Sequence, residues 1–128
     1  MSQTQVVLLV EGDVVVRHPL AEYLRKCGFE VVEVVNGDEA MAVLNAPNLR
    51  FEVVLADMTT PGSGFPLRQW IRTQKPTVDV ILAGTIEKTV EQAGKLCNDG
   101  PAFAKPFEYH IVLDHIRRTM ARRDQDKT

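Results

Sequence analysis

Four runs of apolar and β-branched residues alternate with longer segments in which apolar residues recur at helical spacing. The runs are residues 5–10, 29–35, 51–57 and 78–84, and a shorter run, 102–104, follows near the end of the chain. Stretches such as VVLLV and VVLA are apolar at consecutive positions, which is typical of strands buried on both faces of a parallel sheet. The pattern predicts five strands.

The segments between these runs have the spacing of amphipathic helices. The first, which reaches residue 26, carries an i, i+3, i+4, i+7 stripe made of Leu20, Tyr23, Leu24 and Cys27. Pro19 lacks a backbone donor, so this helix is expected to begin close before it or to kink there, and Gly28 is expected to end it.

Further helices are predicted over 39–44, where Asp38 is the expected cap and Pro47 the stop, and over 85–96 and 108–123. Between the third and fourth strands, a helix carries Leu67, Trp70 and Ile71, with Trp70 expected to be core or half-buried. The last helix has an apolar face of Val112, Ile116 and Met120.

Alternating strands and helices predict parallel pairing with right-handed crossovers. The expected fold class is therefore α/β, an open three-layer (βα)5 sandwich with helices on both faces of the sheet. In such sheets, ligands bind at the carboxyl ends of the strands, beside the point where strand order reverses.

The chain has 128 residues, enough for one domain, which we place at 5–123 between tails at 1–4 and 124–128. A net charge of −2 gives no general attraction to nucleic acid or anionic membrane. There is no apolar run near membrane-spanning length and MSQTQ does not begin a signal peptide, so the cytoplasm is the expected compartment. Cys27 and Cys97 form no metal-binding pattern and are expected to be free, mostly buried thiols.

Charged residues follow the apolar runs at the ends where the strands should converge. Glu11 and Asp13 follow the first run, Asp57 ends the third, and Lys105 follows the fifth. Clustered carboxylates repel one another unless a cation lies among them, and Mg²⁺ is the natural partner. A lysine supplies positive charge to an anion such as phosphate. The competing interpretation is that Asp57 caps a turn and Lys105 is merely solvated or ion-paired.

Three segments, LLVEGDVVVRHPLAEYLRKCGFEVVEVVNGDEAM, VVLADMTTPGSGF and AKPF, together resemble the receiver domain of two-component response regulators. The resemblance covers nearly the whole chain and implies a flavodoxin-like fold with strand order 2-1-3-4-5. It also implies a bacterial phosphorelay protein, in which a carboxylate accepts a phosphoryl group from a histidine kinase or a phosphotransfer protein. A receiver is a signalling module with at most self-catalysed phosphotransfer and dephosphorylation, so no separate enzyme activity is expected.

The resemblance assigns roles to individual residues. Asp57 is the phosphoacceptor and a Mg²⁺ ligand, and Glu11 is the first of the acids that hold the metal. Thr59 falls where a backbone carbonyl binds Mg²⁺. Lys105 contacts the phosphoryl group, and the Lys105–Pro106 peptide is expected to be cis.

The clearest departure from the family is Gly12, which stands where a second metal-binding acid is usual. Glycine offers no side-chain oxygen. Either Asp13 turns inward as a substitute, since Gly12 loosens the backbone, or a water fills the gap and Mg²⁺ binds more weakly.

Further departures affect the switch that the family uses to signal. Ala83 stands in place of a hydroxyl residue, and Ala102 in place of an aromatic one. The loop TTPGSGF is one residue shorter than usual. We therefore expect a phosphorylated receiver with a weakened metal site, and the alternative is a pseudo-receiver that binds proteins without phosphorylation. A small-molecule-binding flavodoxin-like protein is a third reading, disfavoured because no Gly-rich phosphate loop follows the first run.

The resemblance places a homodimer or effector surface on the fourth helix, fifth strand and fifth helix. In this chain that surface would include Glu87, Glu91, Lys95 and Ala102. The arginines of the last helix are interpreted as a solvated face rather than a nucleic-acid site, and neither direct nucleic-acid binding nor membrane binding is expected.

Overall fold

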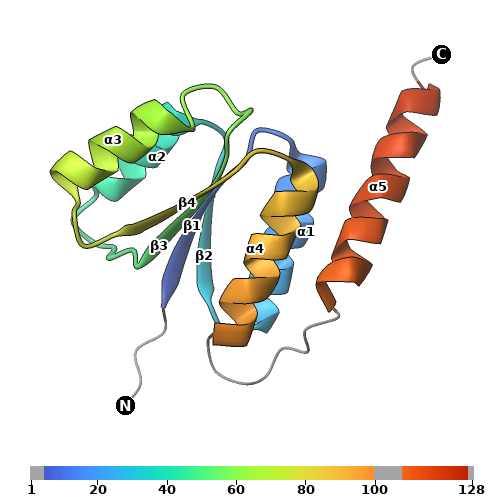
Figure 1. The fold of residues 1–128 in the computed structure, drawn as a ribbon, viewed down its shortest axis with the longest axis horizontal. Helices are drawn as coiled ribbons and strands as arrows, with labels where there is room; N and C mark the ends of the chain where they lie inside the picture. Colours follow the sequence, from blue (N-terminus) through green and yellow to red (C-terminus); the bar gives the residue numbers. More distant parts are fainter. Residues whose placement is uncertain (1–4, 100–107, 127–128) are drawn as a thin grey trace.

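The structure is a computed structural model that describes residues 5–99 and 108–126. Strands and helices alternate through the first four units, and a long helix ends the described chain (Figure 1). The strands are β1 (Val6–Val10), β2 (Glu30–Val34), β3 (Val53–Asp57) and β4 (Asp79–Ala83). The helices are α1 (Val14–Lys26), α2 (Gly37–Leu44), α3 (Phe65–Gln74), α4 (Ile86–Asp99) and α5 (Glu108–Asp126).

The four strands form one parallel sheet in the order β2-β1-β3-β4. All five residues of β1 are buried, as the unbroken apolar run predicts for a central strand covered on both faces. The strand order reverses between β1 and β3, because β1 pairs with β2 on one side and with β3 on the other. The predicted fifth strand, 102–104, lies outside the described residues.

Alternate residues of β1 belong to two separate hydrophobic cores, one on each face of the sheet. Val6, Leu8 and Val10 pack with α2 and α3 on one face of the sheet. Val7 and Leu9 pack with α1, α4 and α5 on the other. Figure 1 shows this division, with α2 and α3 on one side and α4 beside α1 on the opposite side. Trp70 packs half-buried against the first of these cores, as expected.

The helix ends agree with the sequence in part. The stripe of α1 is buried and Gly28 follows its end with φ 100°, a backbone conformation that favours glycine. However, α1 begins at Val14 and continues through Pro19. The prediction that Asp38 caps α2 is wrong. Asn36 is the cap, because its side chain accepts a hydrogen bond from the Glu39 N–H at 2.9 Å, whereas Asp38 lies within the first turn.

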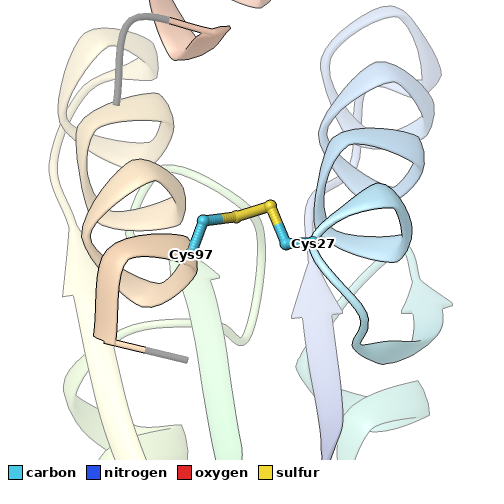
Figure 2. Close-up of a disulfide and its surroundings, with 2 residues drawn as sticks. All are labelled: Cys27 and Cys97. Carbon is cyan, nitrogen blue, oxygen red and sulfur yellow. A yellow bond between two sulfur atoms is a disulfide. The ribbon is translucent and has the colours of Figure 1, made fainter. Parts of the chain in front are cut away.

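The expectation of two free thiols is also wrong. Cys27, at the end of α1, and Cys97, near the end of α4, form a disulfide across a sequence separation of 70 residues (Figure 2). Both residues are buried, as predicted. Sequence spacing could not show the bond, because it depends on α4 packing beside α1, which brings the two Cα atoms to 5.5 Å.

Candidate functional site

Two buried acids lie at the carboxyl edge of the central strands. Val10 pairs with Ala56, so Glu11 and Asp57 follow neighbouring positions on β1 and β3. Only 3% of Glu11 and 4% of Asp57 is exposed. They line a crevice of about 290 Å³ together with Gly12, Asp13, Val16, Thr59, Thr60, Pro61 and Ile86. This crevice lies where strand order reverses, as the parallel topology predicts.

Both carboxylate oxygens of Asp57 accept hydrogen bonds from Thr59. The Thr59 N–H donates to Oδ1 at 3.2 Å, and the Thr59 hydroxyl donates to Oδ2 at 2.6 Å. These bonds arise because the chain turns directly after β3 and folds Thr59 back over the end of the strand. They fix the orientation of the Asp57 carboxylate in the crevice. The assignment of the Thr59 carbonyl as a metal ligand stays a prediction.

Thr60 connects the two acids. Its buried Oγ1 lies 3.3 Å from Glu11 Oε2 and 3.4 Å from Asp57 Oδ2, and it accepts the Gly12 N–H at 3.1 Å. The sequence analysis did not single out Thr60. The only available signal was a second hydroxyl residue in the short loop after β3, and a loop threonine alone has no specific meaning.

Burial raises the pKa of Glu11 above its usual value of 4.5. The Asp13 N–H, which donates to Glu11 Oε2 at 3.0 Å, opposes this shift, as does the Thr60 hydroxyl. The Asp57 carboxylate adds to the rise in pKa, because two negative charges in one crevice disfavour each other. The site therefore has excess negative charge, which a cation or a proton would relieve.

Asp13 has a structural task that the sequence analysis did not assign. Its Oδ1 accepts the Val15 N–H at 2.9 Å and caps α1. Asp13 lines the crevice with Glu11 and Asp57, but within the described residues no three acidic, histidine or cysteine side chains group closely enough to hold a metal ion together. Its role as a substitute metal ligand stays a prediction, and the structure shows it as a cap.

The remaining donor set is compatible with Mg²⁺. This ion commonly binds proteins through one or two carboxylates and keeps several waters. Glu11 and Asp57 supply the two carboxylates at the wall of a crevice with room for such waters. Both would hold the ion, which when bound supplies positive charge to an anion at Asp57.

Ala83 is the nearest residue of β4 to Asp57. The two are paired across the sheet, and Ala83 accepts the Met58 N–H at 2.9 Å through its carbonyl. Its side chain is a methyl group, so this position carries no hydroxyl toward Asp57. Lys105, the Lys105–Pro106 peptide and Ala102 lie outside the described residues, and the predictions made for them stay predictions.

Comparison with known proteins identifies the family. The response regulator receiver domain matches residues 7–117, so the chain belongs to the response regulator receiver domain family. It is 36% identical over 115 residues to the response regulator protein FleR of Pseudomonas aeruginosa, covering 88% of this chain and 24% of FleR. It is 26% identical to the transcriptional regulatory protein ResD of Bacillus subtilis, covering 93% of this chain and 49% of ResD.

Solved receiver structures are similar to this chain over most of its length. The chemotaxis response regulator CheY4 of Vibrio cholerae has a TM-score of 0.59 and 26% identity, covering 91% of this chain and 98% of CheY4. The non-phosphorylated HemR receiver domain of Leptospira biflexa has a TM-score of 0.57 and 26% identity, covering 88% and 94%. The flavodoxin-like fold class is thereby confirmed. Among the described helices, none has the length and apolar character needed to cross a membrane.

Proposed function

We propose that this receiver domain accepts a phosphoryl group on Asp57. The observation that carries the proposal is the position of the Asp57 carboxylate. It ends β3, lines the crevice at the carboxyl edge of the sheet, and lies beside a second buried acid, Glu11. The resemblance assigns the phosphoacceptor to this same residue.

The chemistry is transfer from a phosphohistidine donor. An Asp57 oxygen forms a bond to phosphorus as the bond between phosphorus and the histidine nitrogen breaks, and the histidine leaves as neutral imidazole after taking up a proton. Thr59 donates to both carboxylate oxygens, and each oxygen of a carboxylate has two lone pairs, so one remains for attack on phosphorus while the hydrogen bonds orient the group. Glu11 would hold Mg²⁺ and Lys105 would contact the phosphoryl group. Both roles follow from the resemblance.

Exposed apolar side chains beside the crevice support docking of a protein that carries the phosphohistidine. Val14, Met58 and Phe65 are large apolar residues that are exposed in the described structure, Phe65 to 63%. Val14 begins α1, Met58 directly follows Asp57, and Phe65 begins α3, so all three lie where the chain passes from a strand to the next helix at the edge that carries Asp57. A histidine kinase or phosphotransfer protein that docks over Asp57 would cover this apolar surface.

A pseudo-receiver is the second candidate. Gly12 and Ala83 favour it, because both adjoin the acids and neither supplies the side-chain oxygen usual in the family. In that case the apolar surface formed by Val14, Met58 and Phe65 would bind a partner protein without phosphotransfer. The chain spans about a quarter to half of the length of the curated relatives named above.

Intact-mass spectrometry distinguishes the two candidates. The domain is incubated with acetyl phosphate and Mg²⁺, and the proposal predicts a mass gain of one phosphoryl group that disappears in Asp57→Ala. Asp38→Ala, which changes an acid outside the crevice, is the matched control and should keep the gain. If wild type gains no mass even at high Mg²⁺ concentration, the pseudo-receiver is favoured.

A further inference from the structure

The structure assigns a positioning role to Thr60: its buried hydroxyl takes over, within the acid crevice, the task left by the missing second acid at Gly12. It does so by tying the Glu11 carboxylate, the Asp57 carboxylate and the Gly12 backbone into one network. The inference rests on the proposed function, because it concerns how the same crevice holds a divalent cation.

The position of Thr60 relative to Gly12 is the first support. A β-carbon built on Gly12 would lie 3.7 Å from both Oγ1 and Cγ2 of Thr60 and 3.4 Å from the Val35 carbonyl oxygen. These are close to ordinary contacts, and the φ of Gly12 lies outside the range that favours glycine. An acid could therefore stand at position 12, and Thr60 lines the space that its side chain would enter.

The second support is how the hydroxyl divides its bonds. A threonine hydroxyl donates one hydrogen bond and accepts two. Thr60 accepts the Gly12 N–H, which leaves its single hydrogen for Glu11 Oε2 or Asp57 Oδ2. The hydroxyl can therefore hold one carboxylate while the other stays free to bind a cation. Because Thr60 is 5% exposed, solvent does not readily replace it.

The consequence is a cation site built from two acids rather than three. Groups that orient metal ligands through hydrogen bonds affect affinity strongly, and their removal commonly weakens binding by about 10-fold or more. Thr60 is such a group, since its single hydrogen orients Glu11 or Asp57 and its oxygen anchors the backbone between Glu11 and Asp13. A chain with an acid at position 12 would depend much less on Thr60 for cation binding.

Mn²⁺ binding measured by electron paramagnetic resonance of the free ion tests this role without requiring activity. Thr60→Val keeps the shape and removes the hydroxyl, and Thr60→Ser keeps the hydroxyl. We expect Thr60→Val to weaken Mn²⁺ binding by about 10-fold and Thr60→Ser to stay within about 2-fold of wild type. In a Gly12→Asp background, Thr60→Val should weaken Mn²⁺ binding by less than about 3-fold, because the new acid supplies the missing oxygen.

Melting temperatures followed by circular dichroism separate positioning from folding. A purely structural threonine would lower the melting temperature and the Mn²⁺ affinity by the same amounts in both backgrounds. The inference is overturned if wild type does not bind Mn²⁺, if Thr60→Val binds as wild type does, if Thr60→Ser binds as weakly as Thr60→Val, or if the loss is equal with and without Gly12→Asp. Failure of the proposed function is a separate result, the absence of phosphoryl mass gain in a domain that binds Mn²⁺.

Discussion

The acid crevice has a charge imbalance that can be attributed to individual residues. Glu11 and Asp57 are both almost fully buried and share Thr60 as a hydrogen-bond partner. Burial alone disfavours the charged form of Glu11, and the neighbouring Asp57 adds to this effect. In a receiver without bound cation, this repulsion opposes folding and makes the crevice attract positive charge.

Glu11→Gln should therefore stabilise the cation-free domain at neutral pH. Because the pKa of Glu11 is raised in the folded protein, the folded state binds more protons than the unfolded state between the two pKa values. The free energy of unfolding of wild type then falls as pH rises through this interval, starting near the ordinary value of 4.5. Urea unfolding in a chelator should show a difference between variant and wild type that is largest at neutral pH and shrinks as the solution is acidified.

Glu30→Gln gives the matched comparison, because Glu30 is an exposed acid on β2. The Glu30→Gln variant should not show this pH-dependent increase in the free energy of unfolding. A Glu11→Gln domain that is less stable than wild type at neutral pH would show that the hydrogen bonds of Glu11 outweigh its burial and its repulsion by Asp57.

At the scale of single elements, the start of α2 supports the loop that carries Thr60. The Gly37 N–H donates to the Pro61 carbonyl at 3.1 Å. A β-carbon on Gly37 would overlap the carbonyl group of Gly62, so backbone packs directly against backbone at this point. The sequence marks Gly37 only as part of a turn, because the partner lies in a different loop and becomes a neighbour only in the folded chain.

Gly37→Ala should destabilise the domain. Overlap with the Gly62 backbone costs about 3 kcal/mol when the neighbours cannot move. The gain from replacing a helical glycine by alanine is about 1 kcal/mol. A net loss of about 2 kcal/mol in the free energy of unfolding is expected, measured by urea titration, with weaker Mn²⁺ binding because the Thr59–Pro61 loop is displaced.

Gly84→Ala is the control for this change. A β-carbon on Gly84 meets nothing within 4 Å, and its φ does not require glycine, so stability should hardly change. If Gly37→Ala and Gly84→Ala unfold at the same urea concentration, the close approach of α2 and the loop after β3 does not contribute to stability.

At the scale of the whole molecule, α4 and the disulfide set the arrangement of helices on one face of the sheet. Val90, Ala93 and Cys97 of α4 are buried in the same core as the apolar stripe of α1. α5 covers the far side of this pair, where Ile116 is fully buried and Arg117 bonds Glu87 of α4 at 3.2 Å. That ion pair is exposed and contributes little, so apolar burial and the disulfide hold the three helices together.

Reduction of the disulfide should lower the stability of the domain. In the chain-entropy description, a crosslink across 70 residues restricts the unfolded chain by about 4 kcal/mol. Oxidised wild type should unfold at a clearly higher urea concentration than wild type in a phosphine reductant.

The double variant Cys27→Ala, Cys97→Ala serves as the control. Its unfolding should not respond to reductant and should resemble that of reduced wild type, apart from the loss of two buried sulfur atoms. Equal unfolding midpoints for oxidised and reduced wild type would contradict a stabilising crosslink, as would two free thiols in the denatured oxidised protein.

The sequence by itself determined the sheet, the four described strands and the acids at their carboxyl ends. These depend on local information, because an unbroken apolar run specifies a buried parallel strand and the residue after it is placed at the sheet edge. Glu11 and Asp57 were predicted in this way and lie together in the crevice. Ala83 was predicted as a switch position and is paired with Asp57.

Only the tertiary structure decided how the crevice is completed and how α4 is placed. The sequence analysis considered Asp13 only as a substitute ligand, and the folded chain shows that it caps the start of α1. Thr60, Gly37 and the bond between Cys27 and Cys97 each depend on a partner 24 to 70 residues away. Such contacts arise from packing between elements, and spacing along one chain carries no information about them.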